Sequence, residues 1–397
     1  MRLAEIGALP GGGVDRQALT AGEAEAWHLV LSWGAEGGLL ASVDPVGNLF
    51  LTLPGRDRTL LPVLAGSHLD TQPTGGKFDG AFGTLAALEA VLAMAATSLV
   101  PARDVMVVAW MNEEGSRFAP SIMGSATFAG ERTLAGTRAV VDAAGTTFGE
   151  ALDALLAGFP DLRHRALGFA ADAYLEAHIE QGPMLERHGV PVGVVTGIQG
   201  KTTWEIVLTG AEGHAGTLPM AERRDALAAF AAMAQAMYAE VGGTDPLVKF
   251  TIGRLEIVPN APSVVPSRVA FRVDLRHPDT VMLGSLGLRV EALARGHAGP
   301  CDVRISRMSH AASNAFDPAL RGMIQAAADA RGHATLPILS AAGHDARYLA
   351  PLCPAAMIFI PCRDGVSHAE QEWAEPEHVA AGAQVLADVL WTLATPS

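Results

Sequence analysis

Cysteine and lysine are scarce in this chain of 397 residues, and both shortages exclude classes of protein. The three cysteines, Cys301, Cys353 and Cys362, are too few for a disulfide framework and match no zinc-ribbon spacing. So little cysteine fits a reducing compartment, and we therefore expect a cytoplasmic protein. Three lysines and a formal net charge of −14 leave no polybasic patch, which argues against nucleic acid or an anionic membrane as partner.

A long uninterrupted apolar run is also missing. The most apolar stretch, residues 84–100, contains Glu89 and is shorter than the ~20 residues that a membrane span needs. Within it, Leu85, Leu88 and Leu92 share one helical face, which predicts a buried helix. Glu5 stands early in the chain, and no signal peptide is recognisable. Because apolar residues still make up 49% of the chain, we expect a soluble globular protein with a substantial core.

Apolar runs typical of buried strands alternate with Ala-rich helical segments in the first half of the chain. Residues 60–66 and 105–111 are such runs, and the expected helix over 84–100 lies between them. This βαβ order predicts a largely parallel sheet covered by helices. The C-terminal part repeats it, with a strand at 355–360 and an amphipathic helix at 377–393.

The middle of the chain has a different pattern. It contains a strand at 204–208, a long helix at 225–241 and an alternating strand at 269–275, which is typical of a half-exposed antiparallel sheet. We therefore predict an α/β protein with two domains. Residues 1–199 and 313–397 form one domain with a mixed, largely parallel sheet, and residues 200–312 form an inserted α+β domain.

The densest polar cluster follows the first apolar strand. His68 and Asp70 lie where the ligands of α/β sheets gather, at the carboxyl end of a strand. Residues two apart in a strand point the same way, so the Asp70 carboxylate can hold the far nitrogen of the His68 imidazole, as in many metal sites. Asp79 follows in a Gly-rich segment. The structural alternative is a polar loop in which Asp79 caps the next helix.

Glu113 and Glu114 come directly after the second strand. Adjacent side chains diverge, so one carboxylate can bind a metal ion while the other takes a proton from water. A solvated acidic loop is the alternative. His178 and His368 also lie near transitions from strand to loop. A single histidine is more often structural than a ligand, so the prediction of a site depends on the whole set.

Several motifs together resemble the dinuclear-metal amidohydrolases of the aminoacylase/carboxypeptidase (M20-type) superfamily. The resemblance is greatest to the branch of N-carbamoyl-L-amino acid hydrolases, β-ureidopropionases and allantoate amidohydrolases, and it covers nearly the whole chain. The motifs that carry it are Gly66-Ser-His68-Leu-Asp70-Thr, Gly76-Lys-Phe-Asp79-Gly80, Met111-Asn-Glu113-Glu114-Gly115, Glu176-Ala-His178-Ile-Glu180-Gln-Gly, Gly213-His214-Ala-Gly-Thr217, Gly343-His-Asp-Ala and Ser367-His368.

The resemblance implies a zinc-peptidase-like catalytic domain that holds two divalent metal ions bridged by Asp79. One ion would be completed by His68 and His178, and the other by Glu114 and His368. Oxygen and imidazole ligands suit Zn²⁺ or Mn²⁺, with Co²⁺ and Ni²⁺ as further candidates. Glu113 would be the general base, Asp70 would support His68, and His344 would support the site through hydrogen bonds.

The inserted domain would be a lid and the dimerisation surface of a homodimer. His214 would hydrogen-bond the substrate carbonyl and its oxyanion, and Arg276 would bind the substrate carboxylate, because the guanidinium fork pairs well with a carboxylate. Arg272 on the same strand face is the fallback for Arg276. Further pocket residues expected are Gln181, Gln199, Asn260 and Ser263. Relatives carry Asn where this chain has Ser263, which lacks an amide donor–acceptor pair.

The activity implied is hydrolysis of a linear amide or ureido C–N bond in a small N-carbamoyl or N-acyl amino acid, or in an allantoate-like compound. Metal-bound hydroxide would attack the carbonyl, with Glu113 as general base and later acid. Two alternatives stay open. One is an aminoacylase or dipeptidase, which His178 disfavours, because peptidase and acylase relatives have a carboxylate there, and for which Ser263 leaves room. The other is a catalytically silent binding protein on the same scaffold.

Overall fold

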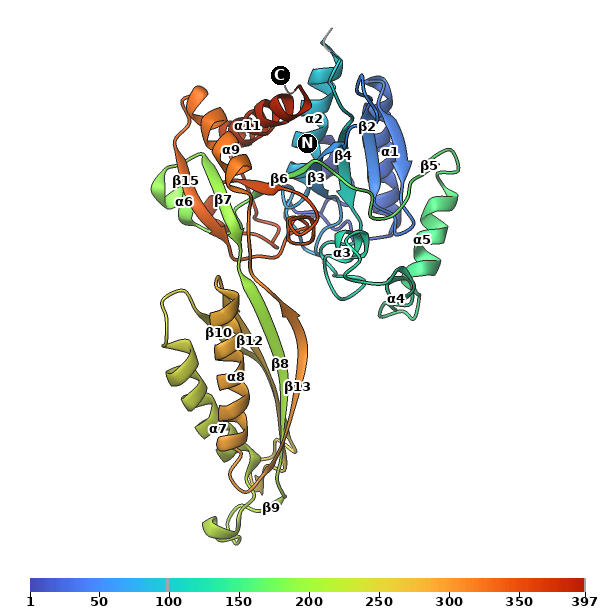
Figure 1. Cartoon of the computed structure of the whole chain (residues 1–397). Helices are drawn as coiled ribbons and strands as arrows, with labels where there is room; N and C mark the ends of the chain where they lie inside the picture. Colours follow the sequence, from blue (N-terminus) through green and yellow to red (C-terminus); the bar gives the residue numbers. More distant parts are fainter. Residues whose placement is uncertain (98–99, 396–397) are drawn as a thin grey trace. The chain divides into compact units, whose positions relative to one another are not determined.

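The computed structural model describes residues 1–97 and 100–395, and its contacts divide the chain into two compact units. The first consists of Met1–Gly197 and the C-terminal part from Ala315, and the second is Ile198–Asn314. Both units appear in Figure 1, where colour follows the sequence. We describe each unit separately.

The first unit is built on a mixed sheet in the order β14-β7-β16-β6-β3-β4-β2-β1-β5, with β15 also paired to β7. The central strands β16, β6, β3 and β4 are parallel, β7 runs antiparallel to β16, and β2 runs antiparallel to β4. The strands are β1 (Leu40–Val43), β2 (Leu49–Leu53), β3 (Val63–His68), β4 (Val105–Trp110), β5 (Arg163–His164), β6 (Ala173–Ile179), β7 (Val192–Ile198), β15 (Thr335–Ser340) and β16 (Ala355–Ile360). The predicted fold class, α/β with a largely parallel central sheet, is confirmed.

Helices cover this sheet. Among them, α2 and α11 pack against each other and over the central strands, and α9 packs on α11 and β16. The helices of this unit are α1 (Ala21–Glu36), α2 (Ala81–Ala95), α3 (Met123–Phe128), α4 (Leu134–Arg138), α5 (Phe148–Ala157), α6 (Met184–His188), α9 (Pro318–Ala330), α10 (Ala346–Leu349) and α11 (Pro376–Ala394).

The helix expected over 84–100 is therefore α2, which begins three residues earlier and ends at Ala95, while residues 98 and 99 of the prediction lie outside the described residues. On its expected apolar face, Leu88 is buried, whereas Leu85 and Leu92 are partly buried, and all three line an apolar cavity of about 990 Å³. Within the described residues, none of the helices combines the length and apolar character that a membrane crossing requires.

The second unit is an antiparallel sheet in the order β10-β12-β8-β13, with two helices packed on it. Phe271, Val273 and Leu275 face the helices, while Arg272 on the opposite face is exposed, as the alternating pattern predicts. The elements are β8 (Gly200–Thr209), β9 (Gly213–His214), α7 (Ala226–Met237), β10 (Lys249–Val258), β11 (Val264–Val265), β12 (Arg268–His277), α8 (Thr280–Gly296) and β13 (Asp302–Ala311). The chain then returns to the first unit through β14 (Asn314–Ala315), which pairs with β7 in the sheet of that unit.

Candidate active site

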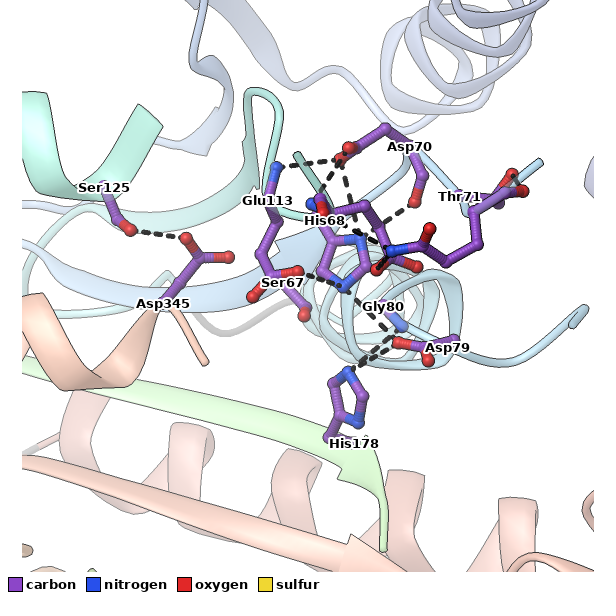
Figure 2. Close-up of polar contacts among 12 residues, drawn as sticks. Ser67, His68, Asp70, Thr71, Asp79, Gly80, Glu113, Ser125, His178 and Asp345 are labelled. Carbon is purple, nitrogen blue, oxygen red and sulfur yellow. Dashed lines mark hydrogen bonds and ion pairs between the residues drawn. The ribbon is translucent and has the colours of Figure 1, made fainter. Parts of the chain in front are cut away.

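The parallel strands of the first unit bring the predicted histidines to one edge of the sheet. His68 is the last residue of β3, and His178 lies one residue before the end of the neighbouring strand β6. Both side chains are 1% exposed. Figure 2 shows both rings directed at the carboxylate of Asp79, which precedes α2.

The two oxygens of Asp79 face different histidines. Oδ1 lies 3.1 Å from Nε2 of His178 and 3.6 Å from Nε2 of His68. Oδ2 lies 3.3 Å from Nε2 of His368, which in turn is 3.4 Å from Oε2 of Glu114. The α2 helix begins after Gly80 with no side-chain cap. Asp79 is therefore not a helix cap, and it joins two groups of potential metal ligands.

These two groups fit a pair of divalent ions. Within each group, His68–Asp79–His178 and Asp79–Glu114–His368, the ligand atoms all lie within 4.8 Å of one another. Ligand atoms on a tetrahedral ion with bonds of ~2.1 Å are about 3.4 Å apart, close to the contacts found here. The donors are imidazole nitrogens and carboxylate oxygens, which suit first-row divalent metals.

Backbone carbonyls fix both buried rings in the tautomer that a metal needs. Nδ1 of His68 lies 2.9 Å from the carbonyl oxygen of Asp70, and Nδ1 of His178 lies 2.9 Å from that of Ile179. A carbonyl can only accept, so we assign the ring proton to Nδ1 in the neutral form of each histidine. The Nε2 lone pair then faces Asp79.

Asp70 supports the site in a different way from that predicted. Its backbone carbonyl, not its carboxylate, makes the hydrogen bond to His68, and the nearest carboxylate oxygen is 3.6 Å from Nδ1. The reason is that β3 ends at His68, so the strand rule on side-chain direction no longer applies at residue 70. The Asp70 carboxylate instead accepts the backbone N–H groups of Glu113 and Glu114, each at 3.1 Å.

The side chains of Glu113 and Glu114 diverge, as expected of neighbours. Oε2 of Glu113 lies 3.6 Å from Nε2 of His68. Oε2 of Glu114 faces His368 and accepts a hydrogen bond from Nε2 of Gln72 at 2.8 Å. Both carboxylates are less than a tenth exposed, so the alternative of a solvated acidic loop does not hold.

Charged groups crowd around Asp79, and they shift one another's pKa values. Burial alone raises the pKa of Asp79, but its contacts with the three histidines outweigh burial and hold this pKa well below the usual range. Burial alone lowers the pKa of His68, but Glu113 and Asp79 raise it well above normal. The pKa of His178 is likewise raised by Asp79 against the effect of burial. Protons on the histidines thus balance the carboxylates, a role that bound cations would take over.

Burial has the opposite effect on the neighbouring carboxyl groups. It raises the pKa of Glu113 well above the usual value, and the carboxyls of Asp345 and Glu114 add to the rise while His68 opposes it. Burial together with Asp79 raises the pKa of Glu114 to about 7. A raised pKa of this kind suits a group that accepts a proton and then returns it.

His344 packs edge-on against His178, with ring centroids 4.5 Å apart, and its Nε2 lies 3.0 Å from Oγ of Ser340. Burial and the neighbouring His178 lower the pKa of His344 well below normal, so its ring stays neutral.

Gln181, expected in the substrate pocket, donates from Nε2 to Oδ2 of Asp79 at 2.7 Å. This glutamine therefore contacts the ligand group itself.

Three residues at the site were not singled out from the sequence. Gln72 binds Glu114, Ser367 contacts Asp79, and Glu372 accepts the backbone N–H groups of Phe78 and Asp79. Ser367 and Glu372 flank His368, and Gln72 follows Asp70 by two residues. The only feature of the sequence that could have identified these three residues is that each lies within a few positions of a predicted site residue.

The other predicted residues lie in the second unit. His214 is exposed at the end of β9, and its Nδ1 accepts the backbone N–H groups of Gly216 and Thr217 at 3.0 and 3.2 Å. With Nδ1 accepting, Nε2 is the donor of the neutral ring, and the imidazole offers an outward N–H.

Arg276 contacts Asp274 through Nε at 2.9 Å, and Lys201 binds the same carboxylate at 3.1 Å. The backbone carbonyl of Ser263 accepts the N–H of Ala215, which places this residue beside the His214 turn. Asn260 has a left-handed φ of 55°. Gln199 is 4% exposed.

Comparison with known proteins identifies the family. Residues 64–392 match the model of peptidase family M20/M25/M40. The chain is 40% identical to an N-carbamoyl-L-amino-acid amidohydrolase of Rhizobium meliloti, over 97% of this chain and 92% of that protein. It is 35% identical to an allantoate amidohydrolase of Escherichia coli, over 99% and 96%. A solved hydantoinase/carbamoylase-family amidase of Burkholderia multivorans superposes with a TM-score of 0.90 at 39% identity, covering 99% and 96%.

The chain therefore belongs to the M20/M25/M40 peptidase family, and the resemblance inferred from its motifs is confirmed.

Proposed function

We propose that this protein is a metal-dependent amidohydrolase that cleaves the C–N bond of an N-carbamoyl-L-amino acid or a related ureido acid. The observation that carries the proposal is the Asp79 carboxylate between two ligand groups, with the Glu113 carboxylate beside His68. The similarity to named N-carbamoyl-L-amino-acid and allantoate amidohydrolases over nearly the whole chain supports the substrate class.

His68 and His178 would hold one ion, Glu114 and His368 the other, and Asp79 both. When bound, such ions supply Lewis acidity and lower the pKa of water to about 7, so that a nucleophile exists at neutral pH. The identity of the metal is part of the proposal, with Zn²⁺ or Mn²⁺ first and Co²⁺ or Ni²⁺ as further candidates.

Glu113 would accept the proton of the attacking water and return it to the departing nitrogen as the C–N bond breaks. Its raised pKa, caused first by burial, supports both halves of this transfer. For an N-carbamoyl substrate, one water yields the free amino acid and carbamic acid, which decomposes to ammonia and carbon dioxide. The Asp70 carboxylate accepts the backbone N–H of Glu113 and would thereby keep Glu113 in place.

The second unit would supply substrate contacts and act as a lid and dimerisation domain in a cytoplasmic homodimer. His214 would donate its outward N–H to the carbonyl oxygen, where negative charge develops, and Arg276 would pair with the substrate carboxylate. Gln181, Gln199, Asn260 and Ser263 would line the pocket.

A substrate panel tests the proposal. The metal-free protein is supplied separately with Mn²⁺, Zn²⁺, Co²⁺ and Ni²⁺, and offered N-carbamoyl amino acids, allantoate, N-acetyl amino acids and dipeptides. We expect turnover of ureido substrates to exceed that of the others. Preference for N-acetyl substrates, for which Ser263 in place of the usual Asn leaves room, would replace the proposal by an aminoacylase. No turnover and no metal binding would indicate a binding protein.

A further inference from the structure

Glu372 contacts the backbone of Asp79 and belongs to neither ligand group. This ionisable side chain is only 2% exposed, and 293 residues separate it from Asp79 in the sequence. Its Oε1 accepts the backbone N–H groups of Phe78 at 2.9 Å and Asp79 at 3.1 Å. Its Oε2 lies 3.1 Å from the hydroxyl of Ser367. A single buried carboxylate therefore connects the Asp79 segment to the segment that carries His368.

Ser367 adds a second connection between these segments. Its Oγ lies 2.8 Å from Oδ2 of Asp79, in addition to its contact with Glu372. A hydroxyl has one proton, so it donates to one of the two carboxyl groups and can accept only from the other when that group is protonated. The Asp79 oxygen involved is the one that faces His368.

His368 needs such support because its backbone is in a strained conformation. Its φ of 54° is left-handed, which costs a non-glycine residue about 1–2 kcal/mol unless the surroundings hold it. Ser367 precedes it, and the N–H of Glu372 donates to the carbonyl of Ala369 at 3.0 Å to close a turn after it. Both ends of the His368 segment are thus attached to the Asp79 segment.

Gly76 leaves the space that Glu372 occupies. A Cβ added at Gly76 would lie 1.9 Å from Oε1 and 2.0 Å from Cδ of Glu372, closer than atoms can approach. The φ of Gly76 is not in the left-handed region, so its backbone accepts alanine. A methyl group at this position would therefore have to displace the Glu372 carboxylate.

We propose that Glu372 is a positioning residue that fixes Asp79 and His368 relative to each other and thereby sets the affinity of the ion these two share with Glu114. This inference rests on the metal pair of the proposed function. Residues that orient metal ligands typically change metal affinity by ~10–100-fold when they are replaced.

Four variants test it: Glu372→Ala, Glu372→Gln, Gly76→Ala and the double variant. Metal-free protein is titrated with Mn²⁺ and with Co²⁺ by calorimetry, and bound metal is counted by mass spectrometry. In Glu372→Ala we expect one of the two ions to bind at least ~10-fold more weakly and the other to bind nearly normally. Glutamine can turn its oxygen to the two N–H groups and its amide to Ser367, so Glu372→Gln should recover most of the affinity.

Gly76→Ala should weaken the same ion, because the new methyl group displaces the carboxylate. In the Glu372→Ala background that methyl group enters vacated space, so the second substitution should have little further effect. Glu377→Ala, which removes an exposed acidic side chain five residues away, is the matched control and should bind both ions normally. Urea unfolding of each metal-free variant separates loss of folding from loss of one ion.

Two normally bound ions in Glu372→Ala, or additive effects of the two substitutions, would overturn the inference. Loss of both ions in equal measure, together with a lowered urea midpoint, would also overturn it, since that is the result of a merely structural role. A wild-type protein that binds no pair of ions would overturn the proposed function first and this inference with it.

Discussion

A carboxylate oxygen of Asp70 accepts the backbone N–H of Glu113 at 3.1 Å, and this bond fixes the start of the loop that carries the expected general base. The other oxygen accepts the N–H of Glu114. Asp70 is fully buried, so both N–H groups depend on it for a partner. Asp70, two residues after the end of β3, therefore orients the two carboxylates that follow β4.

Asp70→Asn should lower both stability and activity. An asparagine amide has one acceptor and one donor group, so one of the two buried N–H groups would face another donor. Leaving such a group unsatisfied costs about 1–3 kcal/mol. We expect a loss of this size in urea unfolding and a reduced rate. Asp15→Asn, an exposed change of the same chemistry, should alter neither.

Glu113→Gln should retain both metal ions and lose at least ~10²-fold in turnover rate, because general acid–base catalysis typically contributes that much. Glutamine keeps the shape of the side chain but cannot accept the proton. The measurement is steady-state kinetics on the best substrate, with metal content determined on the same sample. A near-normal rate in fully loaded protein would remove Glu113 from this role.

His214→Asn separates the chemical from the structural part of His214. Asparagine can still accept the N–H groups of Gly216 and Thr217, which now bind Nδ1, but it lacks the outward N–H. Losing one donor to a developing oxyanion typically costs about 10²–10³ in rate. We expect that loss with unchanged stability and metal content. If His214→Asn is fully active and only His214→Ala is impaired, the histidine serves only to stabilise the turn at Gly216 and Thr217.

The metal-free protein should lose stability as the pH rises above neutral. The hydrogen bond to Asp79 raises the pKa of His368 to about 9, above the value of ~6.5 expected in the unfolded chain. A raised pKa favours the folded state below pH ~6.5, and this contribution disappears as the pH rises through about 9. Urea midpoints of metal-free protein should therefore fall between pH 6.5 and 9. His368→Asn should show a smaller fall, and an equal fall would assign it to other groups.

The main elements of the fold were predictable because strand and helix periods are local. The alternation of Phe271, Val273 and Leu275 with polar residues appears as one buried and one exposed face of β12. His68 and His178 were predictable as neighbours for a similar reason, since carboxyl ends of parallel strands meet at one edge. The motif order supplied the family.

Other parts of the site depend on tertiary geometry that no local period encodes. The contact between Glu372 and Asp79 spans most of the chain, and nothing in the residues around Glu372 specifies where its carboxylate goes. His68 bonds the carbonyl of Asp70 rather than its carboxylate because β3 ends two residues before Asp70, which only the folded backbone determines. The direction of Gln181 toward Asp79 is likewise set by a left-handed φ of 57°.

The most direct test of the account is anomalous diffraction from crystals of the Mn²⁺-loaded protein. We predict two peaks about 3.5–4 Å apart, one beside His68 and His178 and the other beside Glu114 and His368, with one oxygen of Asp79 on each. A single peak, or two peaks that do not share Asp79, would contradict it.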